Sequence, residues 1–239
     1  MPGRGLITIL IILFSAKSFS QQQLLPAGLT AKLDSVRMST GSEAHFGELY
    51  LKTTIAADAY IESLPGEGRI LMKKLEQNFA EYFFHAIDAN YNGAIIPEEW
   101  KNYFNGKELS ALQLKLMGAN AHINGDIWQA MTSSFSLEEI KMLKPFYKDY
   151  NKSIAKIFDD LFESAIEFDK RLRNLHSMTL GLDKVYGRMM LRKWRNRQLK
   201  LAIYSFYQPG KFKRLKKRTE SRRKKLDNII MKRLRQPGQ

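Results

Sequence analysis

The side chains best suited to chemistry lie in one short segment that reads Gly-Ala-Asn-Ala-His-Ile-Asn-Gly-Asp and ends at Asp126. It places a histidine, two asparagines and an aspartate inside an otherwise apolar stretch. On a helix, His122 and Asp126 lie one turn apart on the same face. Asn120 and Asn124 share another face, roughly 160 to 200° away. Buried polar groups need partners, so both faces predict contacts with neighbouring elements.

His122 and Asp126 fit two kinds of chemistry. They could be two ligands of a transition metal, or the carboxylate could hold the imidazole in one tautomer for acid or base work. The structural alternative is a buried polar network that fixes the helix register. The spacing does not match a strong metal signature such as His-Glu-x-x-His, so these alternatives stay open. Gly118 and Gly125 lie near the histidine face and indicate a closely packed neighbour.

A second candidate site resembles an EF-hand calcium loop. Asp88, Asn90 and Asn92 take loop positions one, three and five, Gly93 takes the sharp turn, and Glu99 takes position twelve. Only two of these ligands are carboxylates, and no second loop of this kind accompanies it, both of which weaken calcium binding. We predict a calcium site at residues 88–99, with an ordinary Asn-Gly turn as the alternative.

Three histidines each precede an acid by three or four residues: His45 before Glu48, His85 before Asp88, and His122 before Asp126. Three helices that each offer such a pair could build a metal centre in a bundle core. The alternative is coincidence, because core histidines are often only hydrogen-bonded.

Helices must position these groups, because apolar residues recur at intervals of three and four residues throughout the chain, and strand-like alternation is scarce. We predict an all-α bundle of about seven helices. The expected spans are 27–38, 43–63, 68–89, 97–104, 108–133, 137–168 with a break near Pro145, and 172–207, followed by a basic helix. Ser136 with Glu139 forms a capping box, and Pro97 followed by two glutamates is typical of a first turn.

The first 20 residues predict a cleaved signal peptide, because Arg4 precedes an apolar run and small residues lead into Gln21. Export to a periplasm or to the extracellular space follows from this prediction. The chain has 239 residues and no cysteine, which excludes disulfides, zinc-thiolate sites and cysteine nucleophiles. We expect one helical domain over residues 21–208, which relies on its apolar core for stability.

Positive charge is concentrated in residues 188–239, where 19 Lys and Arg face only Glu220 and Asp227. A break at Pro209-Gly210 separates a helix that packs on the body from a basic amphipathic tail over residues 209–239. Residues 188–239 predict binding to anionic lipid or lipopolysaccharide, and the lack of aromatic interleaving disfavours nucleic acid. The alternative is a solvated basic face. Nothing in the sequence indicates an oligomeric state.

Three segments resemble an uncharacterised all-helical bacterial family, a domain of unknown function. Residues 45–50 match H-F-x-x-x-Y, residues 79–83 match F-A-x-x-[YF], and residues 118–127 match the specific pattern G-x-N-A-H-I-N-x-D-[IL]. The resemblance covers most of the mature chain. It implies that Asn120, His122, Asn124 and Asp126 act as a unit, and it brings no activity with it.

These observations support three hypotheses. The first is a metal-dependent or acid–base hydrolase of the cell envelope, in which His122 and Asp126 bind a metal or activate water and His45 assists. Asn120 and Asn124 then orient the substrate or the backbone. The second is a non-enzymatic module that binds the envelope through its cationic tail. The third is a calcium-binding protein that uses residues 88–99. Signatures of serine hydrolases, phosphate-binding loops and dinucleotide-binding folds are absent from the sequence.

Overall fold

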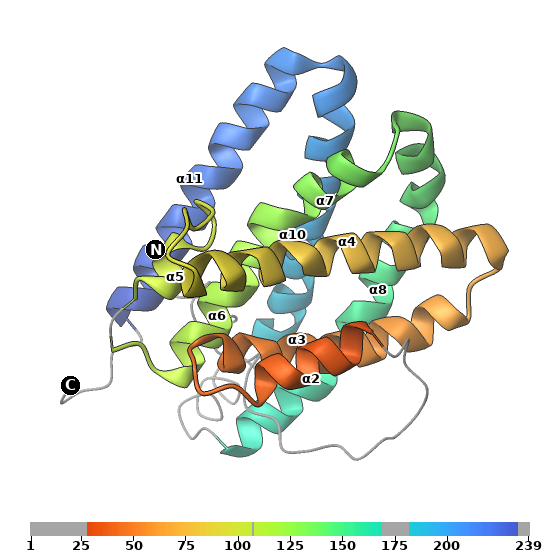
Figure 1. Ribbon diagram of the computed structural model, residues 1–239. Coiled ribbons are helices and arrows are strands. Elements are labelled where there is room, and N and C mark those ends of the chain that lie inside the picture. The colour runs from red at the N-terminus through yellow and green to blue at the C-terminus, as the bar shows by residue number, and fades with distance from the viewer. Residues whose placement is uncertain (1–27, 107, 169–181, 234–239) are drawn as a thin grey trace.

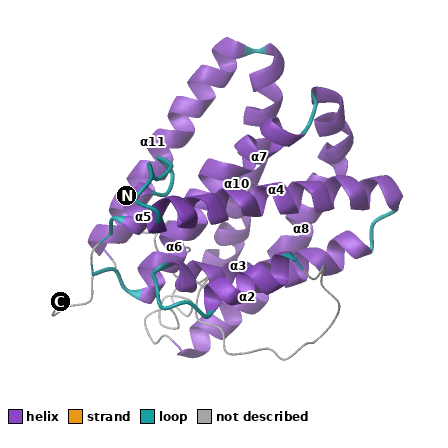
Figure 2. Cartoon of the chain, viewed as in Figure 1, coloured by secondary structure: helices purple, strands orange, loops and turns teal. Residues whose placement is uncertain are grey.

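The computed structural model describes residues 28–106, 108–168 and 182–233, and every regular element in these ranges is a helix (Figures 1 and 2). In chain order they are α2 (Leu29–Arg37), α3 (Glu43–Glu62), α4 (Gly66–Tyr91), α5 (Lys101–Phe104), α6 (Ala111–Ala121), the π-helical turn η1 (His122–Asp126), α7 (Ile127–Ser134), α8 (Leu137–Phe168), α10 (Leu182–Tyr207) and α11 (Pro209–Arg233). With α6, η1 and α7 counted as one continuous helix, these ranges hold eight helices in one domain. The predicted all-α single domain is confirmed.

The turn η1 lies at the centre of the bundle. It contacts α4, α10 and α11, while the continuous helix that contains it also packs on α3 through α6 and on α4 and α10 through α7. In Figure 1, α2 and α3 lie together along one side, and α10 and α11 form a hairpin that rises away from them. The segment at residues 118–126, which carries the histidine, the aspartate and the two asparagines, is therefore surrounded by elements from both ends of the chain.

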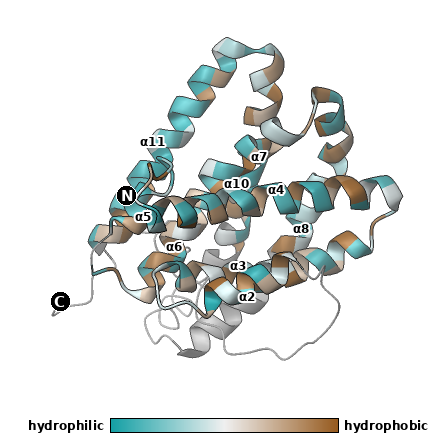
Figure 3. Cartoon of the chain, in the orientation of Figure 1, coloured by the Kyte–Doolittle hydropathy of each residue, from teal (hydrophilic) through white to brown (hydrophobic). Residues whose placement is uncertain are grey.

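Apolar side chains from all of these helices fill the core. Figure 3 shows the expected alternation of apolar and polar bands along most helices, with α11 the most polar. One cluster joins α3, α4, α7, α8 and α10, and a second joins α2, α3, α4, α6 and α11. Phe79 and Ile123 pack against both clusters, so η1 and the middle of α4 lie where they meet.

The predicted break at Pro145 is wrong, because α8 runs from Leu137 to Phe168 with Pro145 inside it. Proline removes one helical hydrogen bond and typically costs about 3 kcal/mol. Ile140, Leu143 and Tyr147 flank it on one face and are fully buried. The packing of this face on either side of the proline holds the helix continuous. The capping box at its start is confirmed, since Glu139 N donates to Ser136 Oγ at 3.2 Å and Ser136 N donates to Glu139 Oε2 at 2.7 Å.

The helix predicted at 97–104 is shorter than expected, because only Lys101–Phe104 is α-helical. The guanidinium of Arg223 donates to the backbone oxygens of Glu98, at 3.3 Å, and of Glu99, at 2.9 Å. These carbonyls would otherwise accept within a longer helix. A contact with α11, made from far along the chain, therefore sets the start of α5.

The break predicted at Pro209-Gly210 is present, since α10 ends at Tyr207 and α11 begins at Pro209. However, α11 packs on the body: Leu226 and Ile230 are in the core, and Thr219, Arg223 and Asp227 are buried as well. The first part of the helix predicted at 172–207 and the leader at residues 1–20 lie outside the described residues. Among the described helices, none has the length and apolar character needed to cross a membrane.

Candidate functional site

The predicted motif forms a helix with a π-helical turn, η1, between α6 and α7. Such a turn carries one extra residue and is frequently found at functional sites. Two glycines allow its close packing. A Cβ atom on Gly118 would collide with the ring of Phe46, and one on Gly125 would collide with the side chain of Glu99. The close approach that the sequence indicated at these glycines is therefore confirmed.

His122 and Asp126 form a buried pair, as their spacing predicted. Nδ1 of His122 lies 2.8 Å from Oδ2 of Asp126, and Trp100 Nε1 donates to the same oxygen at 3.0 Å. The two side chains are only 3% and 2% exposed. The other imidazole nitrogen, Nε2, has no hydrogen-bond partner among the described residues.

Aromatic rings hold the imidazole in place. Phe79 stacks on His122 with ring centroids 3.5 Å apart and planes inclined by 11°, and Tyr50 meets it edge-on at 4.5 Å. Burial lowers the pKa of His122 well below its ordinary value, and the charge of Arg195 lowers it further. Burial likewise raises the pKa of Asp126 well above its ordinary value. The pair is therefore most stable in a form with no net charge.

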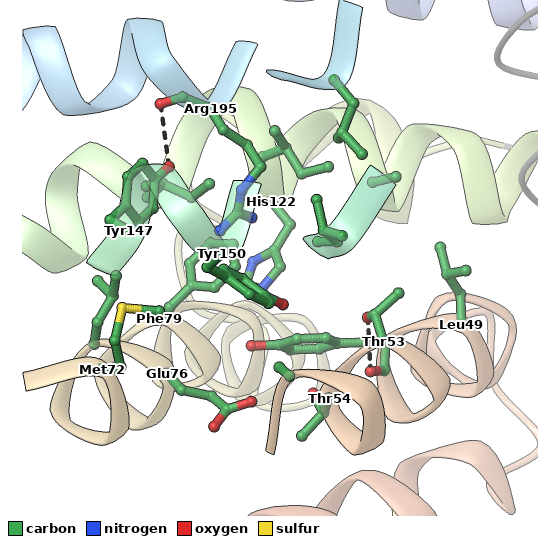
Figure 4. Close-up of a pocket in the computed structure, with 18 of the residues that line it drawn as sticks. Leu49, Thr53, Thr54, Met72, Glu76, Phe79, His122, Tyr147, Tyr150 and Arg195 are labelled. Carbon is green, nitrogen blue, oxygen red and sulfur yellow. Dashed lines mark hydrogen bonds between the residues drawn. The ribbon is translucent and has the colours of Figure 1, made fainter. Parts of the chain in front are cut away.

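A cavity of about 110 Å³ lies beside this pair, lined by residues of α3, α4, α6, η1, α7, α8 and α10. Most of its wall is apolar. Its polar lining includes side-chain atoms that find no hydrogen-bond partner among the described residues, namely Tyr50 Oη, Thr54 Oγ1, Glu76 Oε1 and His122 Nε2. Figure 4 shows His122, Glu76 and Arg195 directed toward the same space from different helices. Buried polar atoms without partners, gathered on one cavity, are typical of a binding site.

One carboxyl group, that of Glu76, lines the cavity, and Asp58 lies next to it. Burial, followed by the nearby charge of Asp58, raises the pKa of Glu76 to about 9. Burial also raises the pKa of Asp58, while a hydrogen bond from Glu76 opposes that rise. Two carboxyl groups this close do not both ionise at neutral pH. Glu76 therefore carries a proton under these conditions and is a proton donor.

Arg195 brings a positive charge to the opposite wall. Its side chain passes over the rings of Tyr147 and Tyr150, with the guanidinium carbon 5.1 Å from each centroid. Nε donates to Asn151 Oδ1 at 2.5 Å, and the Tyr147 hydroxyl donates to the backbone oxygen of Arg195 at 3.1 Å. These contacts from α8 fix the direction of the guanidinium, which Figure 4 shows pointing at the cavity.

Asn120 and Asn124 lie on the other face of the motif, where Asn120 binds α11 and Asn124 binds Asn120. Asn120 Nδ2 donates to the backbone oxygen of Arg223 at 3.0 Å and to Asp227 Oδ1 at 2.8 Å. Asn124 Nδ2 donates to Asn120 Oδ1 at 3.0 Å. Neither asparagine lines the cavity. Their geometry fits the structural alternative, a polar network that fixes one helix against another.

The other predicted site residues lie apart from the cavity. His45 is half-buried on α3 and is not part of the lining. His85 is exposed on α4, and Glu48 is paired with Lys52 and Lys115. The described residues contain no group of three His, Cys, Asp or Glu side chains that could hold a metal ion. The metal centre shared by three histidine–acid pairs is therefore wrong, and a transition metal near His122 gains no support.

The predicted calcium loop is mostly helix at its start. Asp88 and Asn90 are exposed residues within α4, which extends to Tyr91. Two positions apart on a helix, their side chains diverge by about 200°. Asn92 caps the helix, and Glu99 accepts from Gln129 Nε2 at 3.1 Å. The start of the loop does not wrap around one point as an EF-hand does, and the calcium site stays a prediction.

Sequence reasoning missed most of the cavity. Glu76 and Arg195 of the lining, and Asp58 beside Glu76, each interrupt an apolar stripe of a helix, and such interruptions are the signal that could have found them. Their convergence could not be predicted from spacing, because α3, α4 and α10 carry one each.

The fold and the site define a class: an all-α protein whose central helix presents a buried histidine–aspartate pair to a small, partly polar cavity. Over residues 27–233 the chain matches the family described as Family of unknown function (DUF5995), and it belongs to this family. The match extends through α11. Searches of curated proteins and of solved structures find no match.

Proposed function

We propose that the cavity beside His122 is the site of an acid–base hydrolysis of a small polar molecule. The observation that carries this proposal is the state of the imidazole. Asp126 and Trp100 fix one side of the ring, while Nε2 on the other side has no partner among the described residues and belongs to a residue of the cavity wall. A histidine oriented by a carboxylate in this way is the usual arrangement of a general base.

The buried pair supports proton uptake at Nε2. The base is the form of the pair that has lost one proton, with Asp126 ionised, a proton on Nδ1 and Nε2 free. When Nε2 takes a proton from water, the proton on Nδ1 can pass to Oδ2 of Asp126, and the pair returns to its neutral form. Burial favours that neutral form, in agreement with the raised pKa of Asp126. The hydroxide left by the water attacks the substrate carbon. Glu76, protonated at neutral pH because burial raises its pKa to about 9, supplies a proton to the leaving atom.

This assignment revises the roles predicted from the motif. His122 and Asp126 keep their predicted roles, whereas Asn120 and Asn124 support the helix from behind and His45 takes no part. Tyr50 adds a hydroxyl that remains protonated, because burial raises its pKa well above the ordinary value. It therefore donates a hydrogen bond to whatever the cavity holds.

The test is hydrolysis of small esters and amides, with and without a carboxylate group, followed by proton NMR. We expect the full chain to hydrolyse at least one of these esters or amides. His122→Gln should lower the kcat for that substrate by about 100-fold or more. Asp126→Asn should lower kcat as well. His85→Gln is the matched control, because His85 is exposed and outside the cavity. Equal turnover in the protein and in His122→Gln, or ligand binding without any turnover, would contradict the proposal.

A second candidate is binding of an anionic lipid surface by α11, favoured by the arrangement of its charges. Arg214, Lys217, Arg218 and Arg222 lie together on the exposed side of the helix and form no ion pair with other described residues. The nearby Arg222 adds to burial in lowering the pKa of Arg197 on α10. Such unrelieved repulsion favours an anionic surface, with about 1 kcal/mol gained per basic residue. The export predicted from residues 1–20 would bring the protein to such surfaces.

Truncation at Pro209 cannot test this idea, because α11 contributes Leu226 and Ile230 to the core. The sharper variant replaces Arg214, Lys217 and Arg218 by Glu. Its matched control reverses three exposed charges of α8, at Lys141, Lys144 and Lys148. We expect the unmodified protein and the α8 control to bind vesicles that contain phosphatidylglycerol, and this binding to weaken as salt is added. The α11 variant should not bind them. Equal binding of both variants would rule the surface out.

A further inference from the structure

Arg195 is a buried cation with unused hydrogen-bonding capacity. The residue is 6% exposed, and its one side-chain hydrogen bond to the described residues runs from Nε to Asn151. None of the ion pairs among the described residues involves Arg195. The two terminal nitrogens thus lack an acceptor from the described protein, while the side chain lines the cavity. A buried guanidinium without a counter-ion is costly, and a ligand that supplies one would relieve that cost.

The cavity offers Arg195 no charged partner of its own. Glu76, the carboxylic acid that lines the cavity, holds its proton, because burial raises its pKa to about 9. The pair of His122 and Asp126 is also most stable without net charge. Tyr50 and Thr54 present hydroxyl groups, which can donate to an anion but cannot neutralise a cation. Among the residues that line the cavity, Arg195 therefore brings the excess positive charge, and Asp58, which accepts a hydrogen bond from Glu76, lies outside the lining.

The remaining wall limits the size and polarity of the ligand. Leu49, Ala57, Ile61, Met72, Leu75 and Ile154 are among the apolar residues around the space. A volume of about 110 Å³ is smaller than the roughly 150 Å³ of an engineered cavity that holds benzene. A single planar guanidinium matches one carboxylate in a paired, two-bond geometry, whereas a phosphate dianion would bring a second charge that the site does not balance.

We infer that the cavity binds a small monocarboxylate, with the carboxylate on the terminal nitrogens of Arg195 and a short apolar body against the aliphatic wall. The inference rests on the proposed function only in placing a ligand in this cavity. It names the substrate class: a short organic acid bearing a hydrolysable bond, or the acid that hydrolysis releases. His122 Nε2, Glu76 and Tyr50 then face the part of the ligand beyond its carboxylate.

The test is isothermal titration of the full chain with acetate, propionate and butyrate, and with propionamide and propanol as uncharged analogues of similar size. We expect a carboxylate to bind at least about tenfold more tightly than the amide of the same length. Arg195→Gln should abolish this preference, and Arg195→Lys should keep part of it. Arg192→Gln is the matched control, because Arg192 is exposed on the same helix and outside the cavity lining.

Each outcome is decisive. Equal binding of acid and amide by the unmodified protein overturns the inference, as does no binding of any acid or a preference that survives Arg195→Gln. The first comparison needs no variant, so it holds even if Arg195→Gln fails to fold. Acid binding that depends on Arg195, without turnover that depends on His122, would disprove the hydrolase and leave the inference standing. Turnover of uncharged substrates without any binding of acids would disprove the inference and leave the hydrolase proposal standing.

Discussion

The two faces of the motif at residues 118–126 differ in what they contact. On the asparagine face, the amide nitrogen of Asn120 ties α6 to α11, and its oxygen accepts from Asn124 of η1. Asn124 Oδ1 has no partner among the described residues, and neither asparagine lines the cavity. On the histidine face, Nδ1 of His122 is bonded, whereas Nε2 is buried without a partner among the described residues and beside a cavity. One face holds helices together and the other lies beside a cavity, although both consist of polar residues at the same spacing.

The largest expected effect is on the asparagine face. Asp227→Ala leaves Arg223 buried without its carboxylate and removes an acceptor from Asn120 and Asn102. Loss of one partner of a buried ion pair typically costs about 3 to 5 kcal/mol of folding free energy. Urea denaturation measures this loss. The control is Lys224→Ala, on the same helix as Asp227. It breaks an exposed ion pair with Glu98 and should cost under about 1 kcal/mol of folding free energy. Equal losses in both variants would contradict the structural role.

The second effect is a pH dependence of stability that comes from Glu76. Its carboxyl group keeps a proton up to about pH 9 in the folded chain, because burial raises its pKa to about 9 from the ordinary 4.5. Between these two values the folded state binds more protons than the unfolded state. The stability that Glu76 contributes therefore declines as pH rises, by up to about 1.4 kcal/mol per unit. Glu76→Gln cannot titrate, so the folding free energy of the unmodified protein should fall relative to that of the variant as pH rises. A constant difference in urea denaturation from pH 5 to 9 would contradict this.

A third effect tests the close packing behind the histidine. In Gly118→Ala the added methyl group meets the ring of Phe46, which packs 5.6 Å from the imidazole of His122. Overpacking of this kind costs about 1 to 3 kcal/mol. Thermal unfolding should show the loss, and the signals of the His122 ring should move in NMR spectra. Gly66→Ala is the control, since a Cβ atom there meets nothing within 4 Å. An unchanged melting temperature for Gly118→Ala would show that Phe46 has room to move.

The smallest expected stability effect belongs to His122 itself. A glutamine at this position can still reach Asp126 but loses the stacking on Phe79, so His122→Gln should cost only about 1 to 2 kcal/mol. Urea denaturation of His122→Gln and of Asp227→Ala measures the two losses of folding free energy for comparison. A small loss of stability together with a fall in kcat of about 100-fold or more separates the site from the scaffold. A loss as large as that of Asp227→Ala would make both faces structural.

The sequence alone predicted the helices, the paired faces of the motif and the close packing at Gly118 and Gly125. These features are local: helical periodicity and capping groups act over a few residues, so short stretches of sequence are enough to reveal them. The capping box at Ser136 and the break before Pro209 were predicted for the same reason.

Only the tertiary structure decided which of these groups meet. Because of packing on either side of Pro145, α8 continues through this residue. The helix that ends at Phe104 begins only at Lys101, after the carbonyl groups that Arg223 binds. Asp88 and Asn90 lie within α4. The cavity itself joins Glu76 of α4 and Arg195 of α10 to His122 of the central helix. Contacts between distant segments depend on how whole helices pack, and burial then sets the charges of the groups they enclose. Spacing along the chain predicted a helix with two polar faces, and packing against α3, α4, α8, α10 and α11 gave those faces different roles.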